Sequence, residues 1–289
     1  MRGYQKVSFE CFNLKATLES GQVFRYDRDG EFYILQHADF VIKARQQQNS
    51  IIFSGVHADG RQVTEQTVRH LFRLDKSHDD MIRGLRKDRH LNELAERYRG
   101  LHIMRQALFE CIIAFMCSSA ANIPKIKMNV SLLAEKFGKQ FTFEGKEFHS
   151  FPLPGFIDNI QKIKSAKTGF RAKYIFKANK MLTKEFLEEL QAADYAKARE
   201  MLLTIPGIGE KVANCILLFS LGHSKAFPVD TWMKKILLEK YGPQLRVSVK
   251  AKRITEERMT EFGVKRFGNS AGLAQQYLFV HARSRKRIP

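Results

Sequence analysis

The stretch IPGIGEKVANC, residues 205–215, combines a glycine-rich turn with a lysine and a cysteine at the start of an apolar segment. Gly207 and Gly209 permit positive φ and close approach of another molecule, so the backbone N–H groups of the turn can point outward together. Such a cluster at the positive end of a helix binds an anion, for example a phosphate. An ordinary helix–helix turn would use the same residues, so the turn alone does not establish anion binding.

Lys211 follows this turn and falls in the first turn of the expected helix. A lysine amine is a nucleophile only in its unprotonated form, because the attack uses the nitrogen lone pair. The positive end of the helix and the apolar neighbours Val212 and Ile216 disfavour the ammonium form. Cys215 lies four residues further on, on the same helical face, where it could partner the amine or contact a flat ligand. A small core residue would equally explain this cysteine.

The segment AFPVDTW places Asp230 immediately before a second expected helix. An aspartate there commonly caps the helix, which is worth about 1 kcal/mol. Capping and chemistry are compatible, because a carboxylate held by backbone N–H groups stays ionised and can stabilise a positive charge that develops on a sugar. Such a carboxylate could also manage protons for the amine of Lys211.

The elements that position these residues change character along the chain. In the first sixty residues, QVFRY, EFYIL, FVIKARQ and SIIFSG have strand composition, and Asp29-Gly30 suits a tight hairpin turn. From Thr64 onward the pattern predicts helices. Residues 138–155, which contain two nearby prolines, are expected to form a long loop between two helical subdomains around a cleft. The expected helices include ALFECIIAFMCSS, NVSLLAEKFG, RAKYIFKANKMLT, KVANCILLFSL, TWMKKILLEKY and SAGLAQQYLFVHAR.

The chain has 289 residues, enough to bury a sizeable core, and its 49 Lys and Arg against 30 Asp and Glu give a formal net charge of +19. This excess indicates a polyanionic partner, although ribosomal contacts, anionic lipid or simple solubility would also explain a basic surface. The four cysteines are scattered, without metal-ligand spacing, so we expect reduced thiols, no metal and no cofactor. No apolar run reaches the roughly 20 residues of a membrane helix, and the start lacks a signal-peptide core. An intracellular protein without membrane association is therefore expected.

Two motifs together carry a family resemblance. LTIPGIGEKVANCILLFSL followed by AFPVDTW is similar to the helix-hairpin-helix, Gly/Pro-rich and Asp motif of base-excision DNA glycosylases. A lysine at the position of Lys211 occurs in the bifunctional members. The wider context resembles the 8-oxoguanine DNA glycosylase family over nearly the whole chain. The segments that extend the resemblance are LESGQVFRY, FRLD at 72–75, RQALFECIIAFMCSS at 105–119, GFRAKYI at 169–175 and AGLAQQYLF at 271–279.

The resemblance implies an α+β fold that is mainly α, with an N-terminal antiparallel sheet domain and two helical subdomains that flank a DNA-binding cleft. We expect the sheet domain and its following helices at residues 1–100 and the helical glycosylase domain at residues 101–289. The helix-hairpin-helix motif is expected at about 196–215 and the loop of the catalytic aspartate at 226–231. The expected partner is double-stranded DNA that contains 8-oxoguanine, bound by a monomer located with the DNA inside the cell.

The reaction that the resemblance implies is excision of 8-oxoguanine followed by strand cleavage. The damaged nucleotide is extruded, because the sugar C1′ cannot be reached inside a stacked duplex. Lys211 then attacks C1′ as the base leaves, and the resulting imine permits β-elimination. Asp230 is the carboxylate that stabilises the cationic sugar.

The resemblance also assigns residues that recognise the base. 8-Oxoguanine carries a hydrogen on N7 where guanine presents an acceptor, so a backbone carbonyl, here that of Gly21, can tell them apart. Gln275 and Phe279 are four residues apart on an expected helix, so an amide can read the Watson–Crick edge beside a ring that stacks on the base. Cys215 would cover the opposite face of the base. A plain turn glycine and a core phenylalanine are the alternative explanations of Gly21 and Phe279.

Other residues are expected to contact DNA around the lesion. Phe170 matches an aromatic wedge, and Arg171 matches an arginine that reads the orphaned opposite base. This chain has alanines before Asn122 where relatives carry asparagines, Lys125 in place of a second arginine, and Trp232 in place of a histidine that contacts phosphate. Since fewer forked donors face the opposite base, we expect relaxed discrimination for cytosine across from the lesion.

Two other functions remain open at this point. A monofunctional glycosylase of the same fold, acting on alkylated or mispaired bases, would activate water and would need the aspartate without the lysine. A non-enzymatic helix-hairpin-helix module that binds duplex DNA would need the turn and the basic surface but not the residues of a base pocket. Lys211 argues against both alternatives.

Overall fold

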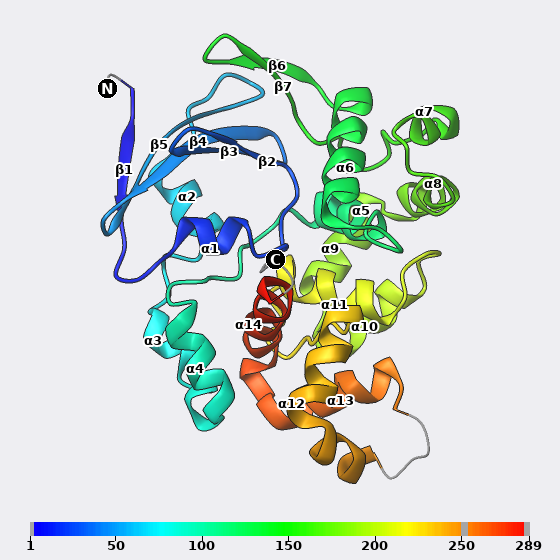
Figure 1. Cartoon of the computed structure of the whole chain (residues 1–289). Helices are drawn as coiled ribbons and strands as arrows, with labels where there is room; N and C mark the ends of the chain where they lie inside the picture. Colours follow the sequence, from blue (N-terminus) through cyan, green and yellow to red (C-terminus); the bar gives the residue numbers. More distant parts are fainter. Residues whose placement is uncertain (1–2, 250–253, 286–289) are drawn as a thin grey trace.

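The computed structural model describes residues 3–249 and 254–285 of the chain. An antiparallel sheet occupies one side of the molecule, and helices make up most of the rest (Figure 1). The predicted α+β fold, mainly α with an N-terminal antiparallel sheet domain, is confirmed. Within the described residues, no helix has both the length and the apolar character of a segment that crosses a bilayer.

The main sheet has five antiparallel strands in the order β1-β5-β4-β3-β2. Asp29 pairs with Phe32 across a turn at Gly30, which has a φ of 60°, so the predicted hairpin turn is confirmed. The strand bounds are β1 Gln5–Ser8, β2 Tyr26–Asp29, β3 Phe32–His37, β4 Phe40–Gln47 and β5 Ser50–His57.

The strand predicted for QVFRY is largely wrong, because only Tyr26 of its five residues belongs to β2. Val23 is buried in the core beneath the sheet, whereas Phe24 is buried in a different, helical core. The two neighbouring apolar side chains therefore belong to two cores, and the backbone crosses between the cores instead of continuing the sheet.

The prediction of a long loop at residues 138–155 is also wrong, because this stretch contains the antiparallel pair β6 (Gln140–Phe143) and β7 (Lys146–His149). Glu144 and Gly145 form the two-residue turn, both with positive φ, as tight hairpins require. Phe141 pairs with Phe148 across the hairpin, and their ring centroids are 6.2 Å apart. The alternation of apolar and polar residues in QFTFEGKEFH is the signal that the polar composition obscured.

Helices precede and follow this hairpin, and all six helical segments predicted from the sequence are confirmed. A short helix within the first sixty residues, α1, was not predicted. Before the hairpin lie α1 (Leu14–Leu18), α2 (Glu65–Leu71), α3 (His78–Ile82), a 3-10 turn (Leu85–Lys87), α4 (Arg89–Arg97), α5 (Leu108–Met116) and α6 (Ile123–Phe137). After it lie α7 (Ile160–Ser165), α8 (Arg171–Met181), α9 (Lys184–Ala192), α10 (Tyr195–Leu203), α11 (Glu210–Phe219), α12 (Thr231–Val249), α13 (Glu256–Phe267), a 3-10 turn (Gly268–Ser270) and α14 (Ala271–Ser284).

The described residues form three hydrophobic cores. One lies between the sheet and α1 and α2, a second joins α5 to α11, and a third joins α3 and α4 to α12, α13 and α14. The helices therefore form two subdomains, as predicted, but residues 138–155 do not divide them, because α5 before this stretch and α11 after it share one core. The proposed division of the chain at residue 100 stays a prediction, and α3 and α4, from the N-terminal part, pack in the same core as the C-terminal helices.

Arg25 links the sheet to the second of these cores. Its side chain is only 1% exposed, and Nη1 lies 3.3 Å from Oε1 of Glu110 in α5. Nη2 donates to Oε1 of Gln36 at 3.0 Å and to the carbonyl of His149. The other oxygen of Glu110 accepts from the N–H of Ala38 at 2.6 Å. This buried pair and its hydrogen bonds fix the sheet against α5.

Replacing Glu110 should therefore destabilise the fold strongly. We expect Glu110→Ala to lower the free energy of unfolding by about 3 kcal/mol, because it leaves the Arg25 cation buried without its counter-ion. Urea denaturation measures this loss. Glu31→Ala is the control, because its carboxylate is 80% exposed beside Arg45 and should change stability by less than about 1 kcal/mol. Equal losses in the two variants would contradict this role of Glu110.

Candidate active site

The turn between α10 and α11 sets the position of Lys211. Gly207 has a φ of 91°, and a Cβ added there would lie 2.6 Å from Cβ of Tyr174, so this position requires glycine. Gly209 has an extended backbone with a φ of −102°, so of the two glycines only Gly207 uses the positive φ that glycine permits. A Cβ added to Gly209 would meet no atom within 4 Å, and its backbone is exposed.

Polar contacts stabilise this hairpin and hold it against the loop that precedes α12. Arg199 Nε donates to Oε2 of Glu210 at 3.0 Å, which pairs α10 with the first turn of α11. Asn214 is fully buried, and its Oδ1 accepts from the hydroxyl of Tyr195 at 3.2 Å and from the N–H of Phe227 at 3.3 Å. Its amide also donates to the carbonyl of Glu210 at 2.9 Å. One side chain therefore joins α10, α11 and the loop at residues 226–231.

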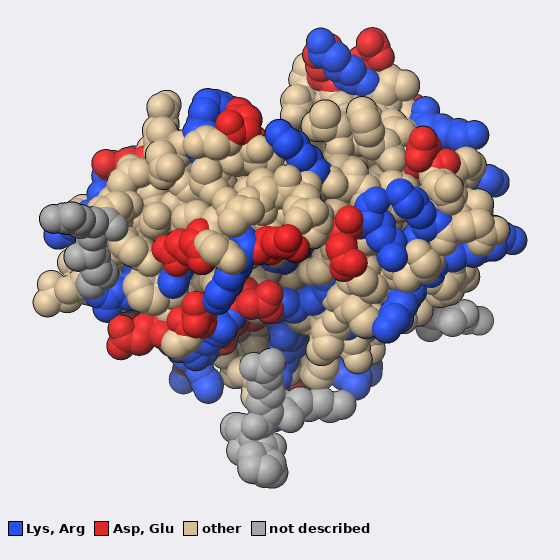
Figure 2. Space-filling view, turned by 90° about the horizontal axis from the view of Figure 1, so that it is seen from above, with Lys and Arg blue, Asp and Glu red and all other residues tan. Residues whose placement is uncertain are grey.

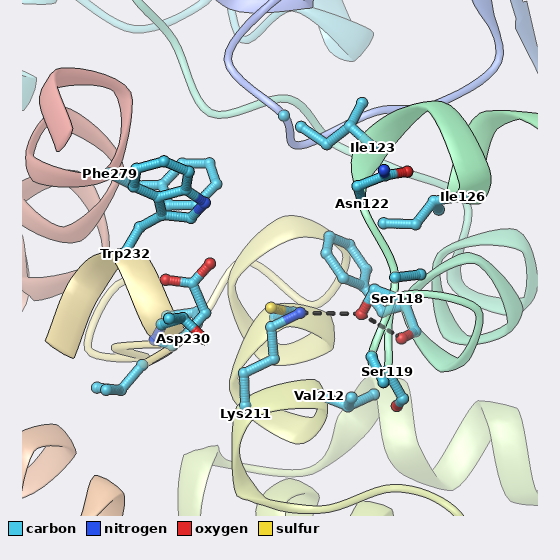
Figure 3. A pocket seen from close by; sticks show the side chains of 18 of the residues that line it. Ser118, Ser119, Asn122, Ile123, Ile126, Lys211, Val212, Asp230, Trp232 and Phe279 are labelled. Carbon is cyan, nitrogen blue, oxygen red and sulfur yellow. Dashed lines mark hydrogen bonds between the residues drawn. The ribbon is translucent and has the colours of Figure 1, made fainter. Parts of the chain in front are cut away.

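The amine of Lys211 reaches across the cavity toward the end of α5 (Figure 3). Nζ donates to Oγ of Ser118 at 2.9 Å and lies 5.4 Å from the centroid of the Phe115 ring. The hydroxyl of Ser118 donates to the carbonyl of Phe115 at 2.6 Å, so its oxygen is the acceptor for the lysine. The sequence analysis missed Ser118, although a polar residue directly after an apolar helix is a usable signal.

Asp230 caps α12, as predicted, because its Oδ1 accepts from the N–H of Met233 at 2.8 Å. Burial raises the pKa of this carboxyl group above the ordinary aspartate value. The N–H groups of Met233 and Trp232 and the positive charges of Lys211 and Arg283 oppose this effect but do not cancel it. Asp230 therefore takes up a proton at a higher pH than an exposed aspartate does.

A single cavity of about 650 Å³ brings most of the predicted site residues together. Its volume falls within the usual range for sites that bind small molecules. Figure 3 shows Asp230 on the opposite side of Lys211 from Ser118, near Trp232 and Phe279. The predicted residues that line the cavity are Gly21, Asn122, Gly209, Lys211, Cys215, Asp230, Trp232, Gln275 and Phe279.

Gln275 and Phe279 lie on one face of α14, as predicted, and both line the cavity. Gln275 is only 4% exposed, and no donor among the described residues reaches its Oε1. A buried acceptor without a partner is rare in folded proteins, so this oxygen suits a ligand that carries N–H donors. Burial raises the pKa of the Cys215 thiol to about 11, although the Lys211 cation opposes the effect, so this thiol is neutral near pH 7.

The other predicted residues lie outside the cavity lining. Phe170 is 59% exposed and directly precedes α8. Arg171 is buried, and its guanidinium donates to the backbone carbonyls of Ser119, Ala120 and Thr168. These donors therefore hold the cavity rim at Ser119 and Ala120 against α8. Gly207 and Lys125 also lie outside the lining; the N–H of Lys125 donates to the side chain of Asn122, which caps α6.

Arg283 is a cavity residue that the sequence analysis missed. Its Cζ lies 5.3 Å from the centroid of the Phe279 ring, and its Nη1 lies 2.7 Å from the position that a Cβ on Gly21 would take. Gln275, Phe279 and Arg283 follow one another at intervals of four residues along α14, so helical periodicity would have found this arginine.

The sequence and the fold are both similar to those of known proteins. A family model for the N-terminal domain of 8-oxoguanine DNA glycosylase matches residues 6–112. The solved structure of MBOgg1 in complex with a low affinity DNA ligand is 30% identical in sequence and has a TM-score of 0.89. The aligned region covers 99% of this chain and 98% of the MBOgg1 chain. The chain belongs to the 8-oxoguanine DNA glycosylase family. The resemblance noted in the sequence is thereby confirmed.

Two further relatives of this family member cover nearly all of the chain. The structure of Clostridium acetobutylicum 8-oxoguanine glycosylase/lyase, in complex with duplex DNA that has cytosine opposite the lesion, is 28% identical with a TM-score of 0.86. The aligned region covers 95% of this chain and 93% of the Clostridium acetobutylicum chain. A protein of Methanothermobacter thermautotrophicus named "Probable N-glycosylase/DNA lyase" is 27% identical over 94% of each chain.

The backbone of Gly21 provides a test of the cavity wall. Gly21 has a φ of 86°, and an added Cβ would lie 2.7 Å from Arg283, 3.1 Å from Phe279 and 3.2 Å from Ile123. Gly21→Ala should therefore lose about 1–2 kcal/mol from backbone strain and about 1–3 kcal/mol more from crowding. Gly30→Ala is the matched control, because Gly30 also has positive φ but an added Cβ meets nothing. Thermal or urea unfolding that gives equal losses for both variants would contradict the crowded wall.

Proposed function

We propose that this chain is a bifunctional DNA glycosylase that excises 8-oxoguanine from duplex DNA through an imine on Lys211 and then cleaves the strand by β-elimination. The observation that carries the assignment of residues is the single cavity lined by the amine of Lys211 and the carboxylate of Asp230. The reaction class predicted from the sequence, an N-glycosylase with DNA lyase activity, is confirmed by the relatives described above.

The reaction begins when the damaged nucleotide leaves the base stack and enters the cavity. The lone pair of unprotonated Nζ of Lys211 attacks the sugar C1′, and the N-glycosidic bond breaks with its electron pair leaving on the base, which then takes up a proton. The nitrogen then gives up its two protons, one that ends on the departing base and one that ends on the ring oxygen as the C1′–O4′ bond breaks, which gives an imine with the opened sugar. The imine makes the neighbouring C2′ hydrogen acidic, so its removal expels the 3′ phosphate and cleaves the strand.

Asp230 acts on the charge that develops during the first step. Its carboxylate stabilises the positive charge on the sugar as the glycosidic bond breaks, and it can accept a proton that the Lys211 amine releases. A raised pKa suits this second role, because proton exchange is most effective when the pKa of the group approaches the working pH. Ser118 orients the amine by accepting one of its N–H bonds.

The base is held by residues from three parts of the chain. We assign the carbonyl of Gly21 to the N7 hydrogen that 8-oxoguanine has and guanine lacks. The unpartnered Oε1 of Gln275 accepts from the N–H donors on the Watson–Crick edge. Phe279 from α14 and Cys215 from α11 line the cavity from two elements, so a flat base fits between a ring and a neutral thiol.

The duplex is held around the cavity. The fold itself does not require glycine at position 209, because a Cβ there would meet no protein atom. A glycine at this position lets a phosphate approach the backbone N–H groups at the start of α11 closely. Gly207 shapes the turn that presents these groups. Phe170 is assigned as the wedge that fills the space left by the extruded base. Further DNA contacts are assigned to Asn122, Lys125 and Trp232. The Arg171 side chain is buried and holds the cavity rim, so it is not assigned a contact with the opposite base.

Relaxed discrimination for cytosine opposite the lesion stays a prediction. The engagement of Arg171 with the carbonyls of Ser119 and Ala120 supports it, because those donors are then used within the protein. We also propose that the chain acts as a monomer located with the DNA inside the cell. A monofunctional glycosylase would give Lys211 no role, and a non-enzymatic module would give the cavity none.

Trapping the imine tests the proposal. Incubation of the wild-type protein with a duplex containing 8-oxoguanine and sodium borohydride should give a covalent protein–DNA adduct, because borohydride reduces an imine to a stable amine. Lys211→Gln should give no adduct in a denaturing gel. Lys234→Gln is the matched control, because Lys234 also lines the cavity but pairs with Glu256, and its adduct should persist. An adduct in Lys211→Gln would contradict the assignment of the nucleophile.

The pH dependence of base release tests Asp230. The pKa of Asp230 is raised, and its ionised form is the active one. As the pH is lowered, activity should therefore be lost at a pH above about 3.9, the pKa of an ordinary aspartate. Asp230→Asn keeps an oxygen for the helix cap but should slow single-turnover base release by about 10²-fold or more and remove this acid limb. An acid limb that is unchanged in Asp230→Asn would show that another group titrates.

A further inference from the structure

A positive surface covers α7 and α8 and ends at Lys184 of α9, which pairs with Glu188 at 3.7 Å. Residues 159–184 contain eight Lys and Arg residues and no Asp or Glu, so this stretch contributes +8 of the net charge of +19. Figure 2 shows Lys and Arg side chains gathered toward the right of the molecule, where Figure 1 places these helices, whereas acidic side chains concentrate over the sheet. The exposed lysines of the stretch are Lys162, Lys164, Lys167, Lys173, Lys177, Lys180 and Lys184.

One side of α8 combines these cations with aromatic rings. Phe170, Lys173, Tyr174 and Lys177 follow the i, i+3, i+4, i+7 spacing of a single helical face, and all four are exposed. Phe170 is 59% and Tyr174 42% exposed, which places them among the most exposed large hydrophobic side chains of the described residues. We call these four residues the α8 outer face. Aromatic rings interleaved with cations are typical of surfaces that bind nucleic acid.

Two contacts place the beginning of the α8 outer face beside the proposed DNA site. Arg171 holds the carbonyls of Ser119 and Ala120, both of which line the cavity, so the first turn of α8 lies against the cavity rim. Tyr174 packs against the hairpin turn, because an added Cβ on Gly207 would lie 2.6 Å from Cβ of Tyr174. The α8 outer face therefore starts between the cavity and the turn to which we assign phosphate binding.

The lysines of this face lack partners within the protein. Among residues 3–249 and 254–285, neither Lys173 nor Lys177 forms an ion pair or a side-chain hydrogen bond, whereas the exposed Lys15 pairs with Glu19 at 2.6 Å. With no acidic residue in the whole stretch, nothing on α7 or α8 offsets their charge. Such a field attracts a polyanion.

We propose that the α8 outer face binds the phosphate backbone of the duplex beside the lesion, with Lys173 and Lys177 each neutralising one phosphate. This inference rests on the proposed function. Seven residues of helix separate Phe170 from Lys177, which corresponds to about 10 Å along the axis. That length matches about three base-pair steps at 3.4 Å each. The face thereby extends the DNA contact from the wedge into undamaged duplex.

The salt dependence of binding tests this surface. The double variant Lys173→Gln/Lys177→Gln should reduce the magnitude of the slope of log K against log salt by about 1.8, since each phosphate contact contributes about 0.9. Fluorescence anisotropy with an 8-oxoguanine duplex between 50 and 200 mM salt measures the slope. As the salt concentration rises from 50 to 200 mM, the ratio of wild-type affinity to variant affinity should decrease by about 12-fold. Glutamine is a good helix former, and both positions are exposed, so α8 should stay intact.

Lys76→Gln/Lys87→Gln is the matched control. Both lysines are exposed, lie outside α7 and α8, and give the same change in net charge, so the slope should stay at the wild-type value. If the magnitude of the slope decreased equally in both double variants, net charge alone would explain the effect, and the proposal would be overturned. A wild-type slope in Lys173→Gln/Lys177→Gln would also overturn it and would leave the face free for another partner, such as an acidic protein.

Borohydride trapping separates this inference from the proposed function. With enzyme in excess at low salt, Lys173→Gln/Lys177→Gln should form the covalent adduct as the wild type does, because both lysines lie outside the cavity. Loss of the adduct in this variant would contradict a role confined to the flanking duplex. Failure of the wild type to form any adduct would instead refute the proposed function.

Discussion

The site depends on a single buried amide. Lys211 and Asp230 lie near the starts of two different helices, 19 positions apart in the sequence, and Asn214 connects the segments that carry them. Because its amide bonds to Glu210, Tyr195 and Phe227, it fixes the loop before α12 against α11 and α10. A satisfied polar network inside a core specifies one arrangement, since every alternative leaves a buried polar group unpaired.

Two helix starts therefore meet in one cavity, and each contributes a different property. The start of α11 supplies a positive end beside Lys211, whereas Asp230 is held at the start of α12 by backbone donors. The low polarity that raises the pKa of Asp230 also strengthens its attraction for a cationic sugar. In the proposed function, binding and chemistry are separated in space. Exposed lysines outside the cavity are assigned to phosphates, the charged groups inside it to the sugar, and neutral groups inside it to the base.

Much of this arrangement could be predicted from the sequence because its signals are local. The glycine turn, the cap at Asp230 and the spacing of Gln275 and Phe279 each lie within a few residues, and the structure has all of them. The missed features depend on contacts between distant segments. Ser118 is significant only because Lys211 reaches it from 93 residues away, and Arg171 is buried only because the loop at Ser119 and Ala120 lies over it. The β6–β7 hairpin was missed because its composition is that of a loop.

The central claim is that one particular amine becomes covalently attached to the sugar. Proteolysis of the borohydride-trapped complex followed by mass spectrometry of the DNA-linked peptide tests it most directly. The modified residue should be Lys211, in the peptide that also contains Cys215. A modification on Lys234, on the N-terminal amine or on any other lysine would contradict it.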